Sequence, residues 1–270
     1  MSQTEIDLPS LSSLGNDLIE TTSIQRWIAL SRPFLCLFAY IIAFSADLFW
    51  VTPFLVFLLF IAVVTVTHDV VHGSLGLSST QTDWALFIFG ALLLESGHAY
   101  RSTHSRHHTV FPGSDDPEGY PAHISFWQAV IYGPVFLPRL WLWAYARNKG
   151  NHRERRWLIS EAIFPLVVVL IGLILWPVTY GLIWYVVLVI VGSWVYPLLT
   201  VHLPHRHFGD TPLNQTHTLR GIIIPALFLE LTYHLEHHLY PQVPSHNLPE
   251  LSRRLTPYFQ AAGVKPVRVP

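Results

Sequence analysis

The sequence predicts an all-α integral membrane protein with four transmembrane helices in two hairpins and a helical cap on the cytoplasmic side. The first observation is composition: 51% of the 270 residues are hydrophobic and only 12% are charged, whereas soluble domains carry about 25% charged residues. The second is a set of four apolar stretches that approach the length of a bilayer span, about 20 residues. The third is the distribution of Lys and Arg, which all fall on one side of the predicted hairpins.

Residues 1–24 contain four acidic residues and neither Lys nor Arg. A secretory signal needs a basic start and an early apolar stretch, so we expect a polar, mobile tail here. Residues 25–258 then form one membrane domain, and residues 259–270 form a C-terminal tail.

The four predicted spans come in two pairs: residues 33–50 with 51–67, and residues 162–180 with 181–201. Only a short turn joins the members of each pair, which predicts a helical hairpin. Trp50, Trp176, Tyr180 and Trp184 lie at the two turns, where amphipathic rings favour the membrane–water interface.

The basic residues predict the orientation of these hairpins. All 16 Lys and Arg residues lie before the first hairpin, between the hairpins or after the second, and neither far-side turn carries one. Loops rich in Lys and Arg stay in the cytoplasm. We therefore expect both termini and the region between the hairpins to be cytoplasmic. The net charge of −1 gives no reason to expect a nucleic-acid partner.

The remaining apolar stretches are expected to be helices that do not cross the membrane. Residues 84–94 and 222–231 are too short to span it and fit interfacial or core helices better. Residues 127–145 are rich in aromatic side chains and interrupted by two prolines, which predicts an interfacial helical segment. Residues 248–259 have the pattern of a short amphipathic helix.

Histidine is the most unusual feature of the composition, because its 16 residues equal all Lys and Arg together. Eight of them form three spaced groups: His68 with His72, His104 with His107 and His108, and His234 with His237 and His238. Residues three or four apart share one face of a helix. A single such pair could be solvated or could cap a helix. The repeated spacing instead predicts metal ligands.

The number and type of these ligands narrow the choice of metal. Neutral imidazole suits Zn, Cu, Fe and Ni. One catalytic zinc takes three protein ligands, so eight histidines fit two ions better. Iron also changes oxidation state and can activate O₂. The single cysteine, Cys36, excludes a thiolate site.

A ligating imidazole usually donates its second ring nitrogen to a carboxylate or carbonyl partner. Acidic residues in or near the three groups are the candidates for this role: Asp69, Asp115, Asp116 and Glu236. Soluble di-iron bundles use carboxylates as ligands, so a site here would be a nitrogen-rich version. Six of the ungrouped histidines are expected to be capping or interfacial residues: His98, His123, His152, His207, His217 and His246.

The three histidine groups resemble the histidine boxes of the membrane fatty acid desaturase and hydroxylase superfamily, and the similarity covers about residues 33–255. This resemblance implies a centre of two Fe ions in the cap, O₂ as co-substrate, and a lipid-soluble substrate whose unactivated C–H bond is oxidised. It also implies two electrons from a separate donor such as ferredoxin. The basic residues 147–156 could dock an acidic donor, or they could serve only to set orientation.

Details of the boxes are similar to the carotenoid ring ketolases and hydroxylases. The first box is followed by Gly73, and a Leu-Pro-His-Arg element at residues 203–206 follows the fourth span. The segment 233–249 and the short length of the chain are also similar to that branch. The resemblance to this branch implies that His205 is a ninth ligand. It also implies that His202 is either a tenth ligand or a residue that holds a ligand in place. The Glu-His-His-Leu-Tyr-Pro string beginning at Glu236 is shared with acyl desaturases and does not discriminate.

Three functions therefore stay open. The first is a carotenoid hydroxylase or ketolase, and the second is an acyl-lipid or fatty acid desaturase or hydroxylase. The third is a non-enzymatic membrane protein that binds or transports metal. Transporters keep ionisable groups near the bilayer midplane, whereas the grouped histidines here lie outside the predicted spans, which argues against the third.

Overall fold

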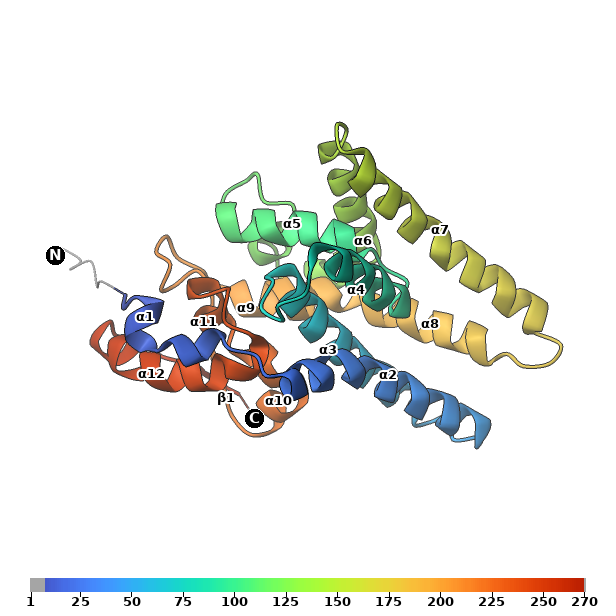
Figure 1. Cartoon of the computed structure of the whole chain (residues 1–270), viewed down its shortest axis with the longest axis horizontal. Helices are drawn as coiled ribbons and strands as arrows, with labels where there is room; N and C mark the ends of the chain where they lie inside the picture. The colour runs from blue at the N-terminus through green and yellow to red at the C-terminus, as the bar shows by residue number, and fades with distance from the viewer. Residues whose placement is uncertain (1–7, 270) are drawn as a thin grey trace.

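The computed structural model describes residues 8–269, and its secondary structure is mostly helical (Figure 1). In this part of the chain, four helices are long and apolar enough to cross a membrane, as the sequence predicts. They are Asn16–Ser45, Thr52–Val71, His152–Leu175 and Gly181–His205. Their mean hydropathy lies between 1.8 and 2.7.

The first two candidate spans are built around helices α2 (Ser23–Ser45) and α3 (Thr52–Val71), which pack against each other. Helix α2 begins with a capping box, in which the Thr22 hydroxyl accepts from the main-chain N–H of Gln25 and the Gln25 side chain accepts from that of Thr22. Helix α3 begins with Pro53 in its first turn, where a missing N–H costs nothing.

The other two candidate spans are α7 (His152–Leu175) and α8 (Gly181–Trp194) with its extension. Beyond α8 the chain continues through a π-helical turn, η3 (Leu198–His202), into the short helix α9 (Leu203–His205). Helices α7 and α8 pack against each other. Their far ends lie on the same side of the molecule as the turn between α2 and α3, while α5, α11 and α12 lie on the opposite side (Figure 1).

Between these pairs lie α4 (Ser79–Leu92), α5 (Gly97–Val110), the turn η2 (Tyr120–His123) and α6 (Phe126–Arg147). The stretch that was expected to be interrupted by prolines is one continuous helix, α6, with Pro134 and Pro138 inside it. A Ser125 capping box starts this helix. Packing against neighbouring helices lets a helix tolerate the loss of the hydrogen bonds that proline removes.

The C-terminal part is compact and contains the only exceptions to the helical prediction among the described residues. Its elements are β1 (Leu219–Arg220), α10 (Ile223–Phe228), η4 (Leu229–Thr232), α11 (His234–Leu239), η5 (Ser245–Asn247), α12 (Leu248–Ala261) and β2 (Val267–Arg268). Strands β1 and β2 pair in parallel. The predicted C-terminal tail is therefore attached to the cap through β2.

The N-terminal segment differs from the expected mobile tail. Residues Leu11–Leu14 form α1 and Asn16–Ile19 form η1. Leu14 and Leu18 are buried in a small core with Leu251 and Leu255 of α12. These apolar side chains are too few to produce a hydropathy peak, but they suffice to dock the segment on an amphipathic partner. Residues 1–7 of the predicted tail lie outside the described part of the chain.

Helix α3 is the central helix of the apolar core. In its most apolar window 72% of the residues are buried inside the protein, compared with 17% for the spans that contain α2 and α7. The outer spans instead expose large side chains such as Leu35, Ile42, Leu166 and Ile174. This distribution fits a central helix surrounded by helices that face lipid.

We expect Gly133→Leu to destabilise the crossing of α6 and α8. A Cβ atom at Gly133 would lie 1.8 Å from the main-chain oxygen of Trp194, which cannot move aside without shifting the helix. Overpacking of this kind costs about 1–3 kcal/mol, and the melting temperature in detergent should fall. Gly150→Ala is the matched control, since nothing lies within 4 Å of its Cβ position. Equal melting temperatures for the two variants would contradict the close crossing.

Candidate metal centre

The structure brings all nine histidines that were predicted as ligands into two adjacent groups. The first group contains His68, His72, His104, His108 and His237. The second contains His107, His205, His234 and His238. Within each group, one ring nitrogen from every residue lies within 4.8 Å of the others, a distance that one central ion could bridge.

Three elements supply the first group. His68 lies in the last turn of α3, and His72 caps the same helix, with its N–H bonded to the His68 carbonyl. The Nε2 atom of His237 lies 2.8 Å from that of His68 and 2.8 Å from that of His108. The Nε2 atoms of His108 and His104 are 3.1 Å apart.

The second group is centred on His205, which α9 presents from the end of the fourth candidate span. Its Nε2 atom lies 2.9 Å from that of His234 and 3.2 Å from that of His107. The Nε2 atoms of His234 and His238 are 3.2 Å apart. The rings of His108 and His238 lie 4.3 Å apart across the two groups, so the two sites are neighbours.

The three histidines on α5 are divided between the two groups, and so are the three on α11. On α5, His104 and His108 are four residues apart and face the first group, while His107 faces the second. On α11, His234 and His238 face the second group, while His237 faces the first. Consecutive residues on a helix point about 100° apart. The adjacent histidines of each doublet are thereby divided between two sites.

Two carboxylates and one carbonyl hold the outer nitrogens of the rings. The Nδ1 atom of His107 lies 2.7 Å from Oδ2 of Asp116, and that of His104 lies 3.1 Å from Oε2 of Glu118. The main-chain oxygen of Gln215 lies 3.0 Å from Nδ1 of His205. Glu118 was not predicted. Its place two residues after Asp116, within the same loop, is the signal that could have found it.

The other predicted partners have different contacts. The Asp69 carboxylate accepts from the main chain and hydroxyl of Ser245, at 2.9 and 2.8 Å. Asp115 is exposed and pairs with Arg106. Glu236 is buried, where it accepts from Thr218 and from Arg220. These three acids position loops and helices around the site.

His202 lies outside both histidine groups. Its Nδ1 atom is 2.9 Å from the carbonyl oxygen of Pro121. His202 is the last residue of the π-helical turn η3. His202 thus tethers η3 to the loop that carries η2.

The donor set fits two ions of the imidazole-binding metals. Among the described residues, Nε2 of His72 is buried in the first group without a hydrogen-bond partner. An unpartnered buried ring nitrogen is costly unless it has a ligand. The other Nε2 atoms lie at hydrogen-bond distance from one another. Neutral imidazoles that bind one cation would bring their Nε2 atoms together in the same way.

Electrostatics keep most of these rings uncharged. Burial, followed by the neighbouring imidazoles, holds the pKa of His104, His234, His237 and His238 well below its ordinary value. His107 is the exception. Burial lowers its pKa, but the hydrogen bond and charge of Asp116 outweigh this effect and leave the pKa raised. Neutral imidazole is the form that binds metal.

Acidification is expected to destabilise the metal-free protein as the pH falls from about 6.5 toward 4. Burial lowers the pKa of His72 to about 4, against about 6.5 in an unfolded chain. Within that window the unfolded chain binds more protons than the folded protein, so the free energy of unfolding falls with pH. The melting temperature of chelator-treated protein should drop across this range. A melting temperature that rose on acidification would contradict the buried, neutral rings.

Asp116→Asn is expected to lower metal affinity by about 10–100-fold, the usual effect of losing a carboxylate that orients a ligating histidine. The amide cannot hold the His107 ring through a charge-assisted bond. Titration of metal into chelated protein measures the affinity. The adjacent Asp115→Asn is the matched control, because Asp115 is exposed and paired only to Arg106 among the contacts of the described chain. Similar losses in both variants would refute the specific role of Asp116.

A long cavity of about 1050 Å³ opens beside the two groups. We call it the long cavity. It follows α3 from Pro53 to His68, a distance of about 22 Å at 1.5 Å per residue. Its walls are mainly apolar side chains of α3 and α8, and its inner end reaches His104, His107 and His234.

A second buried polar cluster was not predicted from the sequence. His98 is fully buried, with Nδ1 2.7 Å from Glu161 and Nε2 3.5 Å from Asp83. Arg101 bridges Asp83 and Glu154 at 2.9 and 2.6 Å. The cluster ties α4, α5 and α7 together, and so holds the helix that carries the second histidine box. His98 is thus a packing residue, not the capping or interfacial residue expected.

Comparison with known protein families agrees with this arrangement. The family described as fatty acid desaturase matches residues 47–268, which is more than half of the 270-residue chain and includes all nine grouped histidines. No curated protein sequence matches the chain. The resemblance carried by the three histidine boxes is therefore confirmed: the chain belongs to the fatty acid desaturase family and is a membrane oxidoreductase with a histidine-rich metal site.

Proposed function

We propose that the two histidine groups bind two Fe ions and that the protein uses O₂ to oxidise a C–H bond of a lipid-soluble substrate. The observation that carries this proposal is the meeting of nine imidazoles in two groups, four of which line a mainly apolar cavity: His68, His104, His107 and His234. Iron supplies the redox chemistry with O₂, which zinc cannot supply because it has no accessible second oxidation state.

The chain's own residues provide position, orientation and a dry site. Asp116 and Glu118 orient His107 and His104, so that their Nε2 atoms point inward. The apolar walls of the long cavity bind the substrate and exclude water from the reacting carbon. Its 22 Å run along α3, estimated from the helical rise, suits an extended hydrocarbon.

The proposed arrangement in the membrane follows from the basic residues. Helices α2 and α3 form one transmembrane hairpin, and α7 and α8 form the other, within a domain of residues 25–258. The far-side turns carry no Lys or Arg, so the histidine-bearing cap and both termini face the cytoplasm. Electrons come from a separate protein such as ferredoxin, for which the exposed basic residues Arg147, Lys149 and Arg153 offer an attractive surface.

A carotenoid is the proposed substrate, with its ring at the metal centre and its polyene along α3. The sequence details that support this choice are Gly73 after the first box and the Leu-Pro-His-Arg element that contains His205. The product is a ring alcohol, or a ketone after a second oxidation at the same carbon.

An acyl lipid is the second candidate, favoured by two observations. Arg206 and Arg268 line the long cavity, where they could pair with the anionic head group of a lipid. The matched family is also described by fatty acid desaturation. In this case the reaction removes two hydrogens from the chain or adds a hydroxyl group to it.

Expression in a host that makes β-carotene distinguishes the two substrates. Pigments and fatty acids are extracted from cells that express the protein and from cells that express the His107→Ala variant. New oxygenated carotenoids in the first sample alone support the carotenoid assignment. Unchanged pigments together with new acyl double bonds or hydroxyl groups would overturn that assignment and support the acyl candidate.

A further inference from the structure

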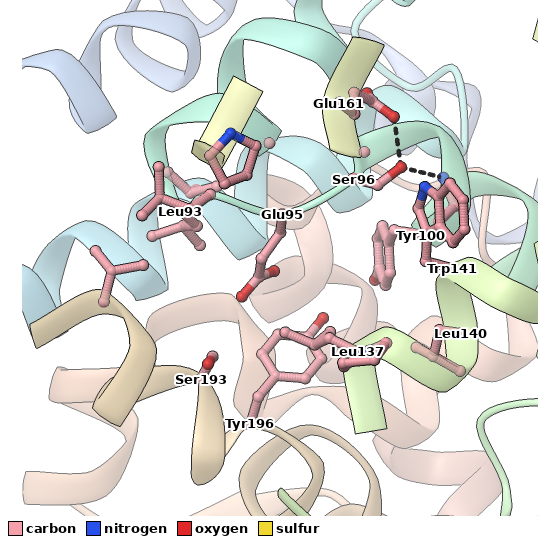
Figure 2. A pocket seen from close by; sticks show the side chains of 18 of the residues that line it. Leu93, Glu95, Ser96, Tyr100, Leu137, Leu140, Trp141, Glu161, Ser193 and Tyr196 are labelled. Atoms are coloured by element: carbon pink, nitrogen blue, oxygen red, sulfur yellow. Dashed lines mark hydrogen bonds between the residues drawn. The ribbon is translucent and has the colours of Figure 1, made fainter. Parts of the chain in front are cut away.

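A second cavity, of about 350 Å³, has Tyr100 and Tyr196 in its lining (Figure 2). We call it the Glu95 cavity. The two tyrosines and Val64 line both this cavity and the long cavity, so these side chains lie between the two cavities. Helices α3 to α8 surround the Glu95 cavity, and most of its lining is apolar.

A tight turn directs Glu95 into this cavity. Helix α4 ends in a Schellman arrangement, in which the N–H of Glu95 donates to the Gly90 carbonyl at 2.9 Å and that of Leu94 donates to Ala91 at 3.2 Å. Leu94 has a φ of 56°, a left-handed conformation that such turns usually assign to glycine. The chain thus adopts an unfavourable backbone conformation to present a carboxyl group to an apolar space.

The carboxyl group of Glu95 lacks the partners that a buried acid normally has. In the described part of the chain, its Oε1 atom is buried without a hydrogen bond. The group points toward Ser193 and Tyr196 and away from Glu161 (Figure 2). Burial raises the pKa of Glu95 to about 8, so the acid carries its proton at neutral pH.

Among the described residues that line this cavity, there is no Lys or Arg that could stabilise an ionised Glu95. The titratable groups that line it are Tyr100 from α5, Glu161 from α7 and Tyr196 from the segment after α8. Glu161 is already engaged by Ser96 and by the ring of His98. The tyrosine hydroxyls are therefore the groups available to exchange a proton with Glu95.

The tyrosine pair connects Glu95 to the metal centre. Both tyrosines line the Glu95 cavity and the long cavity, and the carboxyl group of Glu95 points toward Tyr196 (Figure 2). The ring of Tyr100 stacks on that of His104, with ring centroids 4.7 Å apart. Because hydroxyl groups both accept and donate protons, Tyr196 and Tyr100 offer a route from the Glu95 cavity to the edge of the first histidine group.

We propose that Glu95 supplies the protons of the oxygen reaction, passed through the hydroxyls of Tyr196 and Tyr100 to the long cavity. This inference rests on the proposed O₂-dependent function. Hydroxylation combines RH, O₂, two electrons and two protons to give ROH and one water. Desaturation consumes the same electrons and protons and gives an alkene and two waters. A one-electron donor protein supplies the electrons. Each tyrosine accepts one proton as it releases another and is not ionised, and Glu95 regains its proton from solvent after each transfer.

The test compares Glu95→Gln, Glu95→Asp and Tyr196→Phe in the full-length protein, reduced by ferredoxin and its reductase, with β-carotene and an oleoyl phospholipid as substrates. Loss of a general acid slows turnover by about 100-fold or more, and we expect that loss for Glu95→Gln and Tyr196→Phe with unchanged metal content. Glu95→Asp should retain more activity. Product formed per electron consumed should fall in the two inactive variants, because reduced oxygen then leaks as peroxide.

Two further readouts separate proton supply from a merely structural role. The wild-type rate should fall as the pH rises through about 8, where Glu95 loses its proton, and Glu95→Gln should lack this fall. Infrared spectra of the wild type at neutral pH should contain a protonated-carboxyl band that is absent from Glu95→Gln, whether or not the enzyme turns over. Wild-type turnover in Glu95→Gln, or an unchanged band, would overturn the proposal. If wild-type protein forms no oxidised product at all, the proposed function fails, while the infrared band still tests the protonated acid.

Discussion

Replacing His107 or His237 with alanine is expected to abolish turnover. Each side chain belongs to a different histidine group, so each substitution removes a ligand from one of the two proposed ions. Loss of a group that only orients a ligand costs about 10–100-fold, and loss of the ligand itself should cost more. Product formation in membranes that contain equal amounts of each variant measures the effect.

His152→Ala is the matched control for these variants. His152 is exposed at the first turn of α7, outside both groups, so its loss should leave turnover at the wild-type level. Turnover within twofold of the wild type in His107→Ala or His237→Ala would show that the two groups do not hold the reacting centre.

Leu188→Trp is expected to reduce turnover by about 100-fold without loss of metal. Leu188 of α8 lines the long cavity, and an indole there would obstruct the path along which the hydrocarbon reaches the histidines. A displacement of about 1 Å at the reacting carbon is enough for an effect of this size. Turnover and metal content are measured on the same purified sample, so that an obstructed substrate path can be distinguished from a loss of metal.

The neighbouring residue supplies a control of the same size. Val187 precedes Leu188 on α8 but is exposed on the outer surface, and Val187→Trp should keep wild-type turnover. If Leu188→Trp and Val187→Trp behaved alike, the long cavity would not be the route of the substrate.

The four candidate spans and the grouping of the histidines could be predicted because each depends on local patterns. A span requires only a continuous apolar stretch of sufficient length. The histidine pairs on α3, α5 and α11 follow from helical spacing, which places residues three and four apart on related faces. His205 could be predicted only through the resemblance to a family, since its one neighbour at ligand spacing is His202, which lies outside both groups.

The assignment of ligands to two sites could not be predicted in the same way. His107 and His108 are adjacent in the sequence, yet they belong to different groups because of how α5 is rotated between α3 and α11. Which acidic residue pairs with a given histidine likewise depends on the geometry of the loop. Asp115 and Asp116 are neighbours of the same chemistry, but the loop buries one against His107 and leaves the other at the surface.

Polar residues far from the boxes were the least predictable. Glu95 follows an apolar stretch and has no spacing that marks it, and its environment arises only when six helices assemble around it. Likewise, the buried cluster around His98 joins residues from three helices. A sequence shows that such groups are ionisable, but only the fold determines whether they are solvated, paired or isolated.

Metal quantification of the purified protein tests the central claim most directly. The two histidine groups predict about two iron ions per chain, in keeping with a paired site of imidazole ligands, and about one in His107→Ala or His237→Ala. A preparation that contained about one zinc per chain and no iron, and that failed to bind ferrous iron after chelation, would contradict a paired, redox-active centre.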